Sequence, residues 1–226
     1  MIPLRDHNPS GKTPIVTYSL ITINVLIFLS SFLMTEEALL AFYDQYAITP
    51  ALISQGQNLY TLITAMFLHG GIGHIFGNML FLYIFGDNLE DKLGHVKYLL
   101  YYLVCGLGAS ALQILIDPSS TIPNLGASGA IAGVMGGYLL LFPQHKVDVL
   151  FSFGFSVRKA TLPAYTMLFY WFLMQFLSGV GSLAYIDQMT GGVAYFAHIG
   201  GFLTGLVLIM PVKKSVKFAK IKKSKK

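Results

Sequence analysis

Six apolar runs with almost no charged residues divide this chain, and they constrain its fold more than any other feature. Each run is long enough to approach or cross a bilayer core of roughly 30 Å as a helix. Hydrophobic residues make up 54% of the 226 residues and charged residues only 11%, so polar groups are too few to cover a soluble globule. The sequence therefore predicts an all-α, polytopic membrane protein. The predicted spans are residues 15–34, 74–89, 98–116, 128–142, 160–179 and 196–212.

Basic residues fall on alternate connections between these runs. Arg5 and Lys12 precede the first run, and eight lysines follow the last. The other basic residues are Lys92 and Lys97 after the second run, and Lys146, Arg158 and Lys159 after the fourth. The remaining three connections carry Glu36, Glu37 and Asp44, then Asp117, then Asp187. The positive-inside rule predicts both termini in the cytoplasm, which agrees with an even number of spans.

The regions outside the bundle have simpler roles. We expect a cytoplasmic N-terminal tail (1–14), a six-helix domain (15–212) and a polybasic tail (213–226). Because this tail directly follows a cytoplasmic helix end, we expect it to contact anionic membrane lipids, at about 1 kcal/mol per basic residue, rather than nucleic acid. Between the fourth and fifth runs, residues 147–159 alternate apolar and polar side chains around Gly154, which predicts a small interfacial hairpin.

Polar side chains at membrane depth are costly and indicate function. The second, fourth and sixth runs all begin on the predicted outer side. Their first residues include His74 and Asn78, then Ser128, then His198. The sequence therefore predicts one polar layer near the outer face.

The run that begins at Ser128 is short. Residues 128–142 rise only about 22 Å as a helix, less than the roughly 30 Å bilayer core. The preceding residues 117–127 (DPSSTIPNLGA) would then enter the bilayer as irregular backbone, which is tolerated only beside protein or a water-filled cavity. We expect Ser128 at the floor of such a pocket.

Ser128 and His198 have the chemistry of a nucleophile and its general base. The helix N-terminus beside Ser128 supplies a positive dipole end. His74 and Asn78 share a helix face at i,i+4 spacing, which suits two donors to one oxyanion. Small residues that allow two membrane helices to approach closely occur on the fourth run (Gly129, Gly133, Gly136 and Gly137) and on the sixth (Gly200, Gly201 and Gly205).

Each feature taken alone also has a structural explanation. A membrane serine often bonds to its own backbone, a lone histidine often serves packing, and glycines serve packing with or without chemistry. Two alternatives therefore remain open. One is a non-catalytic protein that binds transmembrane segments. The other is a transporter, or a metal or haem protein that uses His69, His74 and His198.

Three motifs, in this order along the chain, favour the catalytic interpretation. The strings HIFGN (74–78), GASGA (126–130) and AHIGG (197–201) resemble the rhomboid intramembrane serine proteases. The resemblance covers roughly residues 15–212 and includes LITAMFLHGG (62–71) and FGDNLEDKLG (85–94). Together these strings are highly specific.

The resemblance implies a serine endopeptidase that cleaves transmembrane protein substrates near the outer membrane face. It implies Ser128 as nucleophile, His198 as base, and His74 and Asn78 as oxyanion donors with the Ser128 backbone N–H. It also implies structural roles near the site for His69, Gly126, Gly129 and Gly201. No metal ion or other cofactor is required, and the oligomeric state is left open.

The chain departs from the family pattern at two places. Tyr60 and Thr61 stand where many members have Trp-Arg, and Ala132 stands where some bacterial members have a tyrosine that stacks on the base. Another group must therefore orient His198. We expect gating by the fifth run or by residues 179–192, whose glycines permit movement. The short chain, without a transit-like leader, favours a prokaryotic cytoplasmic membrane and leaves an organelle open.

Overall fold

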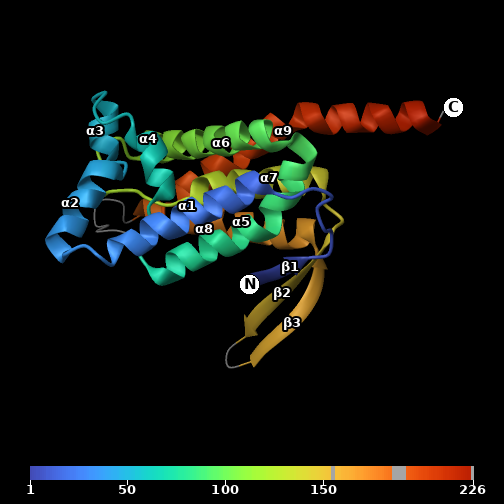
Figure 1. Ribbon diagram of the computed structural model, residues 1–226, viewed down its shortest axis with the longest axis horizontal. Coiled ribbons are helices and arrows are strands. Elements are labelled where there is room, and N and C mark those ends of the chain that lie inside the picture. The colour runs from blue at the N-terminus through green and yellow to red at the C-terminus, as the bar shows by residue number, and fades with distance from the viewer. Residues whose placement is uncertain (154–155, 185–191, 225–226) are drawn as a thin grey trace.

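The computed structural model describes residues 1–153, 156–184 and 192–224. The chain is mostly helical, and the long helices run side by side in one bundle (Figure 1). Short helices lie at one end of this bundle, while a three-stranded sheet and the C-terminus lie toward the other. The helices are α1 Ile15–Ser31, α2 Glu36–Tyr46, α3 Pro50–Ser54, α4 Thr61–Thr64, the 3-10 helix η1 Ala65–Phe67, α5 Ile72–Leu93, α6 His95–Ile116, α7 Ser128–Leu141, α8 Ala164–Ser182 and α9 Tyr195–Ser224. The strands are β1 Ile2–Asp6, β2 Lys146–Phe153 and β3 Ser156–Pro163.

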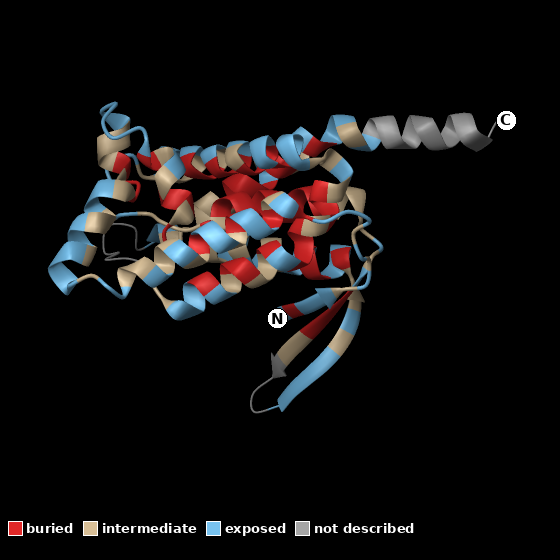
Figure 2. Cartoon of the chain, viewed as in Figure 1, coloured by how far each residue is buried: buried red, intermediate tan, exposed pale blue. Residues whose placement is uncertain are grey.

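Helix α7 forms the centre of the bundle. Its residues from Gly129 to Tyr138 are all buried, and the buried residues gather around it (Figure 2). The helix packs most extensively against α9, because glycines on both helices leave room for the other backbone. A Cβ on Gly201 or Gly205 would collide with the backbone oxygen of Gly129 or Gly133, respectively. The Tyr101 hydroxyl of α6 donates to the Gly133 oxygen at 2.7 Å and ties a third helix to this contact.

Each of the six predicted runs contains a helix, namely α1, α5, α6, α7, α8 and α9. Within the described ranges, two helices, α6 and the Tyr195–Lys213 part of α9, are individually long and apolar enough to cross a membrane. A third qualifies if the bent pair Thr61–Phe67 and Ile72–Leu93, at 94°, is one span. Helices α1 and α7 are apolar but shorter. The presence of six spans therefore remains a prediction. The short length of α7 agrees with what the sequence predicts.

The fifth run begins differently from its prediction. Its first residues, 160–163, belong to β3, and α8 starts only at Ala164. Pro163 explains the boundary, because proline is tolerated at a helix start but cannot donate a backbone hydrogen bond inside a helix. Apolar composition alone did not distinguish the end of a strand from the start of a helix.

The sheet corrects the all-α prediction. Strands β2 and β3 pair antiparallel, as the predicted hairpin requires, but β1 adds a third strand on the other side of β2. Val147 and Val149 of β2 are buried in the hydrophobic core, so this sheet packs on the bundle. The pairing of β1 was not predicted, because residues 2–6 and 147–150 are far apart in the sequence.

Asp148 of β2 holds the three strands together. Its carboxylate accepts hydrogen bonds from Thr161 Oγ1 at 2.6 Å and pairs with Lys159 Nζ at 2.9 Å, His7 Nε2 at 2.8 Å and Arg5 Nε at 3.1 Å. These partners, with Thr161 and Lys159 the strongest, hold the pKa of Asp148 well below its usual range. The Asp148 carboxylate is therefore ionised in the folded protein at neutral pH.

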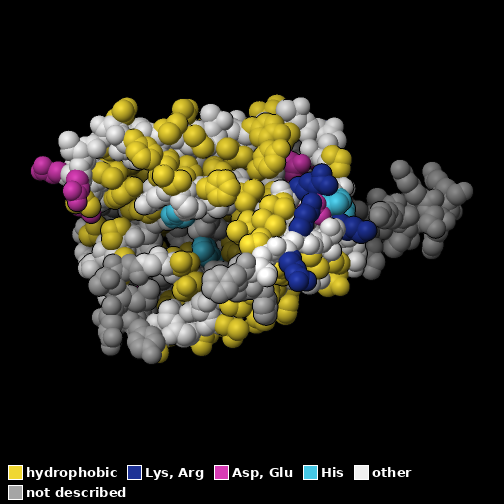
Figure 3. All heavy atoms as spheres, turned by 90° about the horizontal axis from the view of Figure 1, so that it is seen from below, with side chains coloured by type: hydrophobic (Ala, Val, Ile, Leu, Met, Phe, Trp, Pro, Cys, Tyr) yellow, Lys and Arg dark blue, Asp and Glu magenta, His cyan; other side chains and the backbone are white. Residues whose placement is uncertain are grey.

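Lys and Arg side chains gather toward one end of the bundle. Figure 3 shows Asp and Glu side chains at the opposite end and also beside the basic cluster, with many hydrophobic side chains on the face between the two ends. The acidic end is the end of α2, which begins with Glu36 and Glu37. The positive-inside rule concerns Lys and Arg, and their position toward one end agrees with it. The predicted gating segment, 179–192, lies partly outside the described residues, which omit 185–191.

Candidate active site

Ser128 is the first residue of α7, and the segment that precedes it is irregular, as predicted. Backbone hydrogen bonds fix this segment against the region before α5. Ile48 and Asn124 exchange two bonds of 2.9 and 2.7 Å, and Gly126 N–H donates to the Ala65 oxygen at 2.9 Å. Gly126 has φ 127°, which favours glycine. The sharp turn at Gly126 thus directs the chain into α7 with Ser128 at its N-terminus.

His198 meets Ser128 across the contact between α7 and α9. Its Nε2 lies 2.8 Å from Ser128 Oγ, which is hydrogen-bond distance. His198 lies one turn before Gly201, where an added Cβ would overlap the Gly129 backbone of α7. The predicted serine and histidine therefore face each other because glycines allow their helices to touch.

His74 and Asn78 line the same cavity as Ser128 and His198. This cavity has a volume of about 600 Å³, and histidine side chains are visible in a hollow on the face in Figure 3. His74 and Asn78 both lie against Gly126, since a Cβ there would be 2.7 Å from His74 Nε2 and 3.7 Å from Asn78 Nδ2. The four predicted groups therefore surround one space, from three helices.

His69 supports Asn78 from the loop before α5. The Asn78 Nδ2 amide donates to His69 Nε2 at 2.9 Å, and Tyr43 donates to the backbone oxygen of His69 at 3.0 Å. The His69 and His74 rings pack edge to face, 5.0 Å apart. His69 therefore holds the amide of Asn78, which is a structural role beside the site.

The first departure from the family pattern has a local substitute. The Tyr60 hydroxyl donates to the backbone oxygen of Gln45 at 2.9 Å, and Thr64 Oγ1 donates to that of Tyr46 at 2.7 Å. Thr61 is buried and bonds to the Asn58 oxygen at 2.8 Å. These contacts tie α4 to the end of α2 without an arginine.

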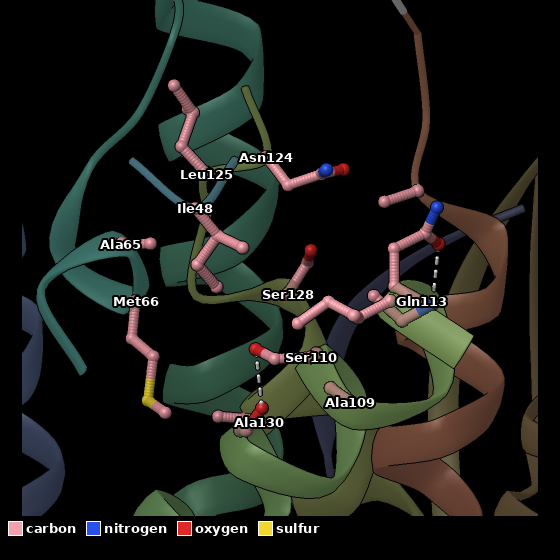
Figure 4. A pocket seen from close by; sticks show the side chains of 16 residues that line it. Ile48, Ala65, Met66, Ala109, Ser110, Gln113, Asn124, Leu125, Ser128 and Ala130 are labelled. Atoms are coloured by element: carbon pink, nitrogen blue, oxygen red, sulfur yellow. Dashed lines mark hydrogen bonds between the residues drawn. The ribbon is translucent and has the colours of Figure 1, made fainter. Parts of the chain in front are cut away.

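A smaller cavity of about 50 Å³ lies on the other side of Ser128. Figure 4 shows the Ser128 side chain in this cavity, with Asn124 and Leu125 on one side and Ser110 and Gln113 of α6 on the other. Gln113 Oε1 accepts a 3.1 Å bond from Ala197 N–H, next to His198. The lining is mostly apolar, with a few polar side chains around Ser128. Within residues 1–153, 156–184 and 192–224, no three His, Cys, Asp or Glu side chains are placed to hold a metal ion.

Two residues of α8 that contact His198 were not predicted from the sequence. Gln175 Oε1 lies 2.7 Å from His198 Nδ1, and the Trp171 ring lies 5.7 Å from the imidazole, tilted by 38°. A signal for Gln175 was present, because it is a lone amide inside a run of apolar residues. Trp171 is the chain's single tryptophan and gave no such signal, because an aromatic residue in a membrane helix is usual.

The fold and the site together define a class of protein. It is a helical membrane protein in which a serine at the N-terminus of a short central helix meets a histidine from a neighbouring helix, beside a cavity that His74 and Asn78 of a third helix also line. The chain belongs to the rhomboid family, because the family model for the Rhomboid domain matches residues 56–215.

Curated relatives from plants and bacteria agree with this assignment. The chain is 36% identical over 156 residues to RHOMBOID-like protein 6, mitochondrial, of Arabidopsis thaliana. This match covers 69% of this chain and 44% of that protein. It is 29% identical over 158 residues to Rhomboid-like protein 11, chloroplastic, of the same plant, and this match covers 69% of this chain and 53% of that protein. It is 32% identical over 152 residues to Rhomboid protease GluP of Bacillus subtilis (strain 168), and this match covers 66% of this chain and 28% of that protein. The chain thus spans about half the length of these relatives or less.

Proposed function

We propose that this protein is an intramembrane serine endopeptidase with Ser128 as nucleophile and His198 as general base. The observation that carries the proposal is the 2.8 Å contact between Ser128 Oγ and His198 Nε2 at the wall of a cavity that His74 and Asn78 also line. The name of one relative, Rhomboid protease GluP, supports the same activity. Nucleophilic catalysis typically uses this arrangement, in which the nucleophile and the base lie within hydrogen-bond reach and a third group holds the base.

In the first half of the reaction, His198 Nε2 takes the Ser128 hydroxyl proton while Oγ attacks the carbonyl carbon of the scissile peptide. The carbonyl π electrons move to the oxygen and form a tetrahedral oxyanion. His198 then gives its proton to the leaving nitrogen, the C–N bond breaks, and an acyl-enzyme ester remains on Ser128. A water molecule repeats the sequence with the same base and releases the acid, so Ser128 regains its proton.

The oxyanion would be held by His74, Asn78 and backbone N–H groups at the start of α7. Ser128 opens this helix, and the first four N–H groups of a helix have no partner within it. Asn78 can donate one amide hydrogen to the oxyanion while the other remains bonded to His69. Removal of one such donor typically costs about 2.7 to 4 kcal/mol of transition-state stabilisation.

The substrate would be a transmembrane segment of a membrane-anchored protein, cleaved near the outer face. The position of Lys and Arg side chains toward one end of the bundle supports an orientation in which both termini are cytoplasmic, and the six apolar runs support six spanning helices. We assign residues 15–212 to the protease domain and the tail 213–226 to contact with anionic lipid. The prokaryotic cytoplasmic membrane is the proposed location.

The test is cleavage of a single-pass substrate by the purified protein in liposomes. Wild type is compared with Ser128→Ala, His198→Ala and the control Ser30→Ala, which removes a hydroxyl that bonds only within α1 to the Ile27 oxygen. We expect cleavage by wild type and Ser30→Ala, and none above background by the other two. Cleavage by Ser128→Ala or His198→Ala at the wild-type rate would refute the proposed pair.

A further inference from the structure

Gln175 faces the side of the His198 ring that points away from Ser128. Its Oε1 lies 2.7 Å from Nδ1, while Nε2 on the opposite side of the ring lies 2.8 Å from Ser128 Oγ. Ser128, His198 and Gln175 thus form one chain of hydrogen bonds across α7, α9 and α8. Trp171 is one turn before Gln175 on the same helix face and flanks the ring.

We infer that Gln175 is a positioning residue that sets the tautomer and orientation of the base, an inference that rests on the proposed function. An amide oxygen can only accept a hydrogen bond, so His198 Nδ1 must carry the ring proton. Nε2 then has a free lone pair directed at the Ser128 hydroxyl. A reversed amide would force the proton onto Nε2, and the base could not accept the serine proton.

The amide performs this role without a charge. In soluble serine proteases a carboxylate holds the histidine and also stabilises the imidazolium. Helices α7 and α8 contain no Asp or Glu, and neither does α9. A carboxylate at this depth would carry a desolvation cost that a neutral amide avoids. Gln175 therefore orients the ring and leaves imidazolium stabilisation to the rest of the site.

The position of α8 makes the base sensitive to this helix. Few α8 residues are buried, and large side chains such as Phe169 and Leu177 are 62% and 54% exposed. The helix packs mainly on α9, which carries His198. Because Gln175 and Trp171 both come from α8, displacement of α8 from α9 removes both groups that hold the ring.

The first test compares the kinetics of Gln175→Leu, Gln175→Glu and a neighbouring control, Met174→Leu, which changes a 40% exposed apolar side chain. Gln175→Leu keeps the approximate size of the side chain but cannot accept from Nδ1. We expect kcat to fall about 10-fold to 100-fold with KM unchanged, and thermal unfolding to stay close to that of wild type. Met174→Leu should retain wild-type kinetics. An unchanged kcat in Gln175→Leu would overturn the inference.

Gln175→Glu restores the acceptor and adds a charge, so it separates positioning from packing. It should retain activity near the upper end of the pH profile. The carboxylate also stabilises the protonated imidazole, so activity should be lost at a higher pH as the medium is acidified. Among the described residues, the ionisable side chain that faces His198 from another helix is His74 of α5, which all variants retain. A profile identical to that of wild type would contradict the inference.

The second test needs no substrate. Nitrogen-15 NMR of histidine-labelled protein, with His198 assigned by its loss in His198→Ala, reports which ring nitrogen is protonated. We expect the Nδ1–H tautomer in wild type and a mixture in Gln175→Leu. The Nε2–H tautomer in wild type would refute the role of Gln175 even if Ser128-dependent cleavage is observed. Conversely, cleavage that does not require Ser128 would refute the proposed function while this tautomer result could still stand.

Discussion

Replacement of Gly201 by alanine should separate the two helices that carry Ser128 and His198. The added Cβ would collide with the backbone oxygen of Gly129 on α7, and it would lie 2.8 Å from the Gly129 carbonyl carbon. The obstructing atoms belong to helical backbone and cannot rotate away. Relief of the collision therefore requires α9 to move outward by roughly 1 Å.

The size of the expected effect on kcat follows from the position of Ser128 and His198. His198 lies one turn from Gly201, so most of this movement reaches the 2.8 Å contact between Nε2 and Ser128 Oγ. A displacement of about 1 Å at a reacting centre costs on the order of 100-fold in rate. Overpacking a well-packed interior costs about 1 to 3 kcal/mol in the free energy of unfolding. Both effects should appear in Gly201→Ala.

The assay measures kcat for a single-pass substrate in liposomes and the thermal unfolding midpoint in detergent. Ser30→Ala is the control, because this hydroxyl bonds to the Ile27 oxygen within α1 and the change also introduces an alanine. It should leave kcat and the thermal midpoint close to those of wild type. If Gly201→Ala retains wild-type kcat and stability, the close glycine contact does not position the pair, and the reasoning is wrong.

Three further predictions concern the oxyanion donors and the sheet. Asn78→Ala should slow cleavage by roughly 100-fold to 1,000-fold, and an unchanged kcat would reassign Asn78 to packing. Asp148→Asn should lower the thermal midpoint at neutral pH, because Arg5, His7 and Lys159 lose their shared carboxylate. The lowered pKa of Asp148 stabilises the fold above the ordinary Asp pKa, so the difference from wild type should shrink as the pH falls below it; a constant difference would contradict this. Burial, opposed by the Tyr138 hydrogen bond and aided by Asp87, raises the pKa of Asp6 to about 6. The folded chain therefore binds more protons than the unfolded chain between about pH 4 and 6, so the free energy of unfolding should fall as the pH rises through this window. The Asp6→Asn variant should lack that fall.

Much of the helical framework follows from the sequence because membrane helices carry their own signal. A run of apolar residues must satisfy its backbone hydrogen bonds internally, so each predicted run contains a helix. Helix α7 begins at Ser128, the residue from which its short length was predicted. The polar residues at membrane depth also gathered as expected, since His74, Asn78, Ser128 and His198 line one cavity.

The parts that the sequence did not predict depend on contacts between distant segments. The pairing of β1 with β2 joins residues separated by more than half the chain, and no local pattern indicates such a partner. The contact of Gln175 with His198 depends on how α8 rotates against α9, whereas the sequence indicates only that an amide lies in an apolar run. The contact of His69 with Asn78 likewise requires the bend before α5.

Covalent labelling of Ser128 tests the central claim most directly. The protein in detergent is treated with a fluorophosphonate, and the modified residue is located by mass spectrometry in wild type and His198→Ala. An activated serine should be modified at Ser128 in wild type, and the rate should fall to background when His198 is removed. Modification of another residue, or equal labelling of Ser128 without His198, would contradict the proposed nucleophile and base.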